Sequence, residues 1–104
     1  MDRIDINAVV FHDGDHWVAQ CIEFDIAARA DEPGKLPRAI ERALVANLAM
    51  NRELGRLGLD GIEPAPPQFR ELFERAPFDL SKRNGEIRSP EGVRIRDLRL
   101  AEAV

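Results

Sequence analysis

The sequence predicts one α+β domain: a three-stranded antiparallel meander, a covering helix, a short second helix and a last strand (β-β-β-α-α-β). Three observations predict it. Short β-prone runs separated by turn residues fill residues 4–30, an amphipathic run fills residues 36–54, and an alternating apolar run fills residues 93–100. A chain of 104 residues has room for one hydrophobic core, so we expect a single domain.

The three front strands are predicted from apolar runs and the turns between them. Residues 4–11 begin with apolar and polar residues in alternation and end in Val-Val-Phe. Asp-Gly then precedes a return strand at residues 16–22, and Gly14 is suited to a tight hairpin because glycine adopts positive φ without steric cost. A short turn at residues 23–25 leads to a third strand at residues 26–30.

The predicted covering helix spans residues 36–54. Pro37 fits its first turn, where a missing N–H does no harm, and Gly55 supplies a stop. A helix over one face of the meander stabilises so small a sheet. The apolar residues at helical spacing are Leu36, Ile40, Ala43, Leu44, Leu48 and Met50.

The rest of the chain is predicted to complete the same domain. We divide the chain into residues 1–59 and a C-terminal extension of residues 60–104, which starts with a proline-rich connector at 60–67. A short helix follows, with Phe69, Leu72, Phe73 and Ala76 on one side. The last strand slips in its alternation near Asp97, which indicates a β-bulge. We expect this strand to lie parallel to the first, with both helices on one face of the sheet.

Composition excludes several classes of protein. The net charge of −4 and the pI of about 5.2 argue against non-specific nucleic-acid binding. The apolar runs fall far short of the roughly 20 residues that a membrane span needs, and the N-terminus lacks a secretory pattern. A single cysteine fits a reducing compartment, so we expect a cytoplasmic protein.

Charge is unevenly distributed. Residues 1–52 hold nine acids and six bases, whereas residues 81–99 hold six bases and three acids. We interpret the basic tail as packing beside the acidic front half; a basic patch for an acidic partner is the alternative.

The polar run from His12 to His16 and the single Cys21 could each suggest metal binding or catalysis. The run from His12 to His16 contains two imidazoles and two carboxylates, but zinc needs further His or Cys ligands, so we expect no metal and no cofactor. Cys21, with one of these histidines as base, lacks the motif of a catalytic nucleophile, and we interpret it as a buried strand residue. Trp17 is interpreted as a core or interface residue rather than a base-stacking platform.

A nuclease whose carboxylates bind two metal ions is another possible function. Such enzymes need several acids that converge on two metal ions. Asp5, Glu41 and Asp97 lie on suitable elements, but Glu41 falls on the charged side of the predicted helix. We therefore predict no catalytic residues and no enzyme activity.

Residues 17–40 resemble the HicB-like antitoxin family, and the resemblance extends over about residues 4–54. Trp17 matches the aromatic residue that begins the family's second strand, and Asp31 matches the acidic residue of the turn before the helix. Ala30 and Glu32 depart from the family, which often has Gly and a Thr or Ser cap there. Residues 60–104 show no helix-turn-helix or ribbon-helix-helix pattern, so we expect no DNA binding.

The resemblance implies a partial ribonuclease-H-like fold for the HicB-like part (residues 1–59), a non-catalytic role and frequent oligomerisation. Its implied partner is a HicA-like mRNA-interferase toxin, which the antitoxin binds and neutralises. We expect the toxin-facing surface to be acidic, because an RNA-binding toxin is expected to be basic. The alternative is an oligomeric interaction or structural module without a toxin. The candidate partner-binding residues are Asp13, Asp15, Trp17, Glu23 and Asp25.

Overall fold

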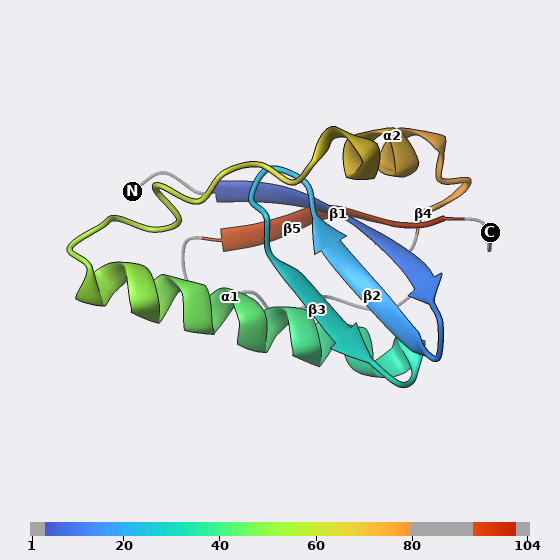
Figure 1. Cartoon of the computed structure of the whole chain (residues 1–104), viewed down its shortest axis with the longest axis horizontal. Helices are drawn as coiled ribbons and strands as arrows, with labels where there is room; N and C mark the ends of the chain where they lie inside the picture. The colour runs from blue at the N-terminus through green and yellow to red at the C-terminus, as the bar shows by residue number, and fades with distance from the viewer. Residues whose placement is uncertain (1–3, 80–92, 102–104) are drawn as a thin grey trace.

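The computed structural model describes residues 4–79 and 93–101, and it has a mixed five-stranded sheet between two helices (Figure 1). The strand order is β3-β2-β1-β5-β4. The predicted α+β class is confirmed. The strands are β1 (Ile4–Asp13), β2 (His16–Cys21), β3 (Ala27–Ala30), β4 (Phe78–Asp79) and β5 (Val93–Leu100).

The front three strands form the predicted antiparallel meander. β1 pairs with β2 up to Asp13 and His16, which flank a two-residue turn, and β2 pairs with β3. Gly14 takes the first turn position with φ of 63°, a conformation that type II′ hairpin turns reserve for glycine. The sequence signal at Asp13-Gly14 therefore located the hairpin correctly.

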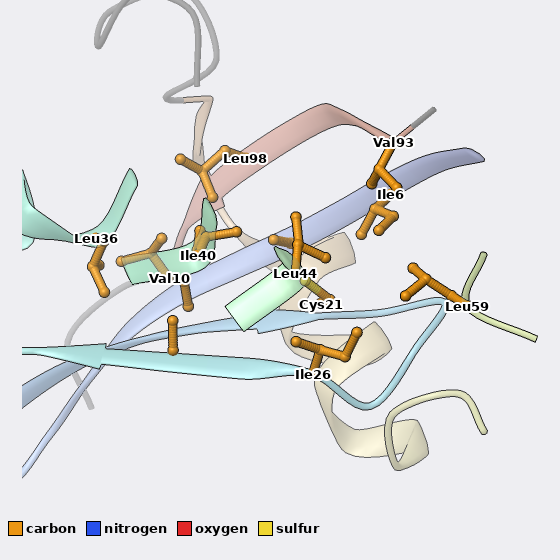
Figure 2. Close-up of a cluster of buried hydrophobic side chains, with 13 residues drawn as sticks. Ile6, Val10, Cys21, Ile26, Leu36, Ile40, Leu44, Leu59, Val93 and Leu98 are labelled. Carbon is orange, nitrogen blue, oxygen red and sulfur yellow. The ribbon is translucent and has the colours of Figure 1, made fainter. Parts of the chain in front are cut away.

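Helix α1 (Leu36–Glu53) follows a single 3₁₀ turn (Pro33–Lys35) and covers one face of the meander, as predicted. Figure 2 shows Leu36, Ile40 and Leu44 of α1 pointing into the cluster of apolar side chains that this face of the sheet contributes. Burying such a side chain contributes roughly 1.5–3 kcal/mol, and among the described residues this cluster is larger than the one on the other face.

Met50 does not belong to the buried side of α1, contrary to the prediction, because its side chain is 61% exposed. Asn51 takes the buried position in that turn instead. Its amide Nδ2 donates to the carbonyl oxygens of Gly58 and Asp60, each at 3.0 Å. These bonds fold the following loop against the helix and help to bring Leu59 into the core.

Helix α2 (Pro67–Arg75) lies on the opposite face of the sheet from α1, so the prediction of both helices on one face is wrong (Figure 1). The reason lies partly in β1, where consecutive apolar residues cover both faces. Val10 packs toward α1, whereas Val9 clusters with Phe73 of α2, and the ring of Phe11 stacks on Phe69 at 5.8 Å.

The connector carries the chain to that second face. The amide of Ala65 donates to the carbonyl oxygen of Ile22 at 3.0 Å, and the amide of Asp25 donates to Glu63 at 2.7 Å. The proline-rich segment is thus held against the turn after β2, at the end of the sheet. From there α2 is placed over the face that α1 leaves uncovered.

Strand β5 runs parallel to β1, as predicted, and it contains the predicted bulge. Ile6 is opposite Ile95, and the next residue, Asn7, is opposite Asp97, so Arg96 is the extra residue. Without an extra residue, a strand alternates strictly and the apolar residues after Arg96 would face the other side. The bulge lets both Ile95 and Leu98 pack in the α1 layer.

The sequence did not reveal β4, a two-residue strand that pairs with the end of β5. The guanidinium of Arg99 of β5 lies 4.3 Å from the ring centroid of Phe73 and donates to the carbonyl oxygen of Phe73 at 3.3 Å.

Most of the predicted basic stretch, residues 81–92, lies outside the described residues. In the part of the chain that is described, no helix is both long and apolar enough to cross a bilayer.

Candidate functional site

The first two candidate residues lie at the tip of the β1–β2 hairpin. Asp13 ends β1 and Asp15 is the second turn residue, and both are exposed. The Asp13 carboxylate accepts a hydrogen bond from the Arg29 guanidinium at 3.3 Å. This ion pair is solvated, with side-chain exposures of 57% and 65%, so it contributes little to stability.

Two further acids share this end of the sheet and were missed by the sequence analysis. Trp17 of β2 pairs with Ala30 of β3, so Asp31 and Glu32 follow at the same end as the hairpin tip. The Lys35 ammonium lies 3.1 Å from Asp31 and 3.9 Å from Glu32. The hydrogen bond from Lys35, and then its charge, lower the pKa of Asp31, and the same contacts raise the pKa of Lys35.

We call these four residues (Asp13, Asp15, Asp31 and Glu32) the acidic end. Among the described residues, Asp13 pairs with Arg29, and Asp31 and Glu32 share Lys35, so these acids outnumber the cations that pair with them. The pairing register of the meander is the signal that could have located Asp31 and Glu32.

Trp17 lies just inside the acidic end. Its ring is 4.7 Å from the ring of His12, its cross-strand neighbour, and it packs against the main core cluster. The side chain is only half-buried. Trp17 therefore belongs to the core and keeps part of its surface exposed.

The other two candidate residues lie at the opposite end of β2. Both carboxylate oxygens of Glu23 accept hydrogen bonds from Asn7, one from its backbone N–H at 2.7 Å and one from Nδ2 at 2.8 Å. Asp25 accepts a hydrogen bond from Nε2 of the buried Gln20 at 3.0 Å. These carboxylates join the turn after β2 to the sheet.

The five candidate residues therefore do not form one patch. β2 has six residues, which at about 3.3 Å each separate its two ends by roughly 17 Å. The structure brings Asp13, Asp15 and Trp17 together and places Glu23 and Asp25 elsewhere.

The two histidines of the hairpin do not converge. His12 is opposite Trp17 and Asp13 is opposite His16, so the alternation of strand side chains puts the imidazoles on opposite faces. Among the residues from 4 to 79 and from 93 to 101, no three His, Cys, Asp or Glu side chains gather as a metal site would require.

Cys21 is buried, with 1% of its surface exposed. Burial, with a smaller effect from the nearby Glu23 charge, raises the pKa of its thiol to about 12. The thiol is therefore protonated at neutral pH and unsuited to nucleophilic attack, in agreement with the expected structural role.

The sheet separates Glu41 from the other two carboxylates considered for a nuclease. Asp97 is opposite Asn7, on the face of β1 that also holds Asp5 and Val9, and α2 covers part of that face. Glu41 lies on α1, which covers the other face. These carboxylates do not come together in the arrangement that a two-metal centre needs.

No family model matches the chain. No curated protein and no solved structure matches it either.

Proposed function

We propose that this chain is a non-catalytic, cytoplasmic HicB-like protein that binds and neutralises a HicA-like mRNA-interferase toxin. The observation that carries the proposal is the acidic end, where exposed carboxylates surround a hairpin tip beside a half-buried tryptophan. An aromatic anchor with charged residues around it is a common composition for a protein-binding surface.

The order of the elements supports the HicB-like assignment. The resemblance implies a hairpin, a third strand, an acidic turn and a covering helix, and β1, β2, β3 and α1 occur in that order. We extend the proposal to the partial ribonuclease-H-like fold, for which the meander with a parallel neighbour, β5, is the supporting feature.

Electrostatics favours a basic partner. A protein that binds RNA is expected to carry a positive surface, and complementary charge accelerates association and selects the partner. The four carboxylates of the acidic end exceed the two neighbouring cations, Arg29 and Lys35. Glu23 and Asp25 are left out of the proposed surface because their carboxylates bond to the half-buried Asn7 and the buried Gln20, whereas the ion pairs of Asp13 and Asp31 are solvated.

A test compares two double variants that change the net charge equally. D13N/D15N alters the acidic end, and E23Q/D25N alters the opposite end. Binding of the product of a short basic reading frame beside the gene is measured by calorimetry at two salt concentrations. We expect D13N/D15N to weaken binding about tenfold at low salt and less at high salt, because salt screens exposed charges.

The control variant, E23Q/D25N, should change the affinity little where it remains folded. Equal weakening by both variants would show that only net charge matters and would remove the proposed surface. If the wild-type chain binds no such protein, the antitoxin proposal fails.

The second candidate is a self-associating interaction module without a toxin. The observation that favours it is the position of β3 at the edge of the sheet, where its outer backbone groups face no other described strand. Self-association is compatible with toxin binding, so this candidate differs from the first only in the absence of a toxin.

A further inference from the structure

The edge strand β3 is protected against pairing with another strand only by its short length and one charge. It is Ala-Ala-Arg-Ala, with no proline and one charged side chain, and the register of β2 with β3 is regular. Proteins normally protect such edges with charges, prolines or bulges. Of the strands described, only β2 pairs with β3.

The backbone groups of β3 that point outward can be identified. The amide of Cys21 donates to the carbonyl oxygen of Ile26 at 2.9 Å, so residue 26 turns its polar groups toward β2. Backbone direction alternates along a strand, so Ala28 and Ala30 also face β2, whereas Ala27 and Arg29 face outward. The open edge therefore presents two N–H and two C=O groups.

We propose that two copies of the chain associate through antiparallel pairing of their β3 strands, about a two-fold axis at Ala28. In this register Ala27 is opposite the partner's Arg29, and both outward pairs exchange hydrogen bonds. The two sheets then join into one. This inference deepens the self-association suggested above and rests on it, but it does not depend on the toxin.

The register follows from three restrictions. Directly opposite residues in a sheet point to the same face, so the axis must pass through a residue and not between two. An axis at Arg29 would place the guanidinium opposite its own copy, and like charges directly opposite are destabilising. An axis at Ala27 would need the amide of Asp25, which already donates to the carbonyl oxygen of Glu63. The axis at Ala28 instead places Arg29 beside the exposed and uncharged Ala27.

The experiment uses two substitutions of opposite charge at the exposed Ala27, measured by sedimentation equilibrium over a concentration series. A27E places a carboxylate opposite the partner's Arg29, and A27K places an ammonium there. Two symmetric pairs at about 0.2–1 kcal/mol each change the dimer dissociation constant about two- to thirtyfold. We expect A27E to tighten the dimer and A27K to weaken it.

The other outcomes each overturn the inference. A dimer that A27K tightens and A27E weakens has another register, because an axis at Arg29 would bring Ala27 opposite the partner's Asp31. A dimer that neither variant changes uses another surface. A strict monomer at high concentration removes the pairing, and if that monomer still binds the toxin, the proposed function stands.

A cross-linking measurement tests the register without relying on charge. A27C and R29C are prepared separately, oxidised alone, and then oxidised as a mixture; the native Cys21 is buried and does not compete. Opposite residues lie about 5.5 Å apart between Cα atoms, within disulfide reach, whereas identical residues lie about 8 Å apart. We expect the disulfide only in the mixture, and efficient cross-linking of R29C alone would contradict the register.

Discussion

The two ends of strand β2 carry acidic residues that look equivalent in the sequence but differ in the structure. At the hairpin tip, Asp13 and Asp15 are exposed, and the ion pair with Arg29 is solvated. At the other end, Glu23 holds the backbone and side chain of Asn7 through both oxygens. The comparison separates carboxylates that hold the fold together from carboxylates that remain solvated, although the sequence gives both the same appearance.

The largest expected contrast between the two ends is in thiol reactivity. Cys21 lies beside the Glu23 end, and its pKa is raised from 9.0 to about 12, mainly by burial. We expect the native thiol to react with a thiol reagent near neutral pH at least about a hundredfold more slowly than in the unfolded chain, because little thiolate forms.

The matched control is D15C, which adds a thiol at the exposed tip. Mass spectrometry is used to monitor the labelling of D15C. We expect one thiol of each chain to react fast and the other to react slowly. If both thiols were modified at similar rates in the folded protein, the Glu23 end would be open to solvent.

The second contrast is in stability. E23A leaves the N–H and Nδ2 of Asn7 without their carboxylate, and hydrogen bonds to charged groups contribute roughly 1.5–3 kcal/mol. We expect the free energy of unfolding to fall by about 2 kcal/mol in urea titrations. D15A, at the tip, should change it by less than about 0.5 kcal/mol. Equal losses would contradict the structural role assigned to Glu23.

The smallest contrast is a pH dependence at the acidic end. Lys35 lowers the pKa of Asp31 below its ordinary value of 3.8, so the unfolded state binds the proton more readily. The stabilisation is present above the unfolded pKa and is lost as the pH falls through the folded pKa.

We therefore expect D31N to make the loss of stability below about pH 4 slightly shallower, as measured by urea midpoints at a series of pH values. The effect should be small because the pair is exposed. A steeper acid limb in D31N would contradict the assigned direction of the pKa shift.

Local patterns in the sequence were sufficient for several elements. Asp13-Gly14 located the hairpin. The slip near Asp97 located the bulge, because side chains on one face of a strand recur at every second residue and an extra residue interrupts that spacing. The bulge itself lies one residue earlier, at Arg96.

The position of α2 could not be predicted in the same way. The run Val9-Val10-Phe11 shows that both faces of β1 are apolar, but it does not say which helix covers which face. That choice depends on backbone hydrogen bonds of the connector, from Ala65 to Ile22 and from Asp25 to Glu63. Such contacts between distant backbone groups leave no pattern in the sequence.

The candidate site was predicted in part. Asp13, Asp15 and Trp17 lie together, but Glu23 and Asp25 are close to them only in sequence number, because β2 extends between them. Asp31 and Glu32 were missed for the converse reason, since the antiparallel register returns the chain to the hairpin tip.

The central claim, that a partner binds the acidic end and not the Glu23 end, is tested most directly by backbone amide chemical shifts. A catalytically inactive HicA-like toxin is titrated into the labelled chain. We predict shift changes concentrated at residues 13–17 and 29–35, with little change at Asn7, Glu23 and Asp25. Changes centred on those last three residues, or no changes at all, would contradict it.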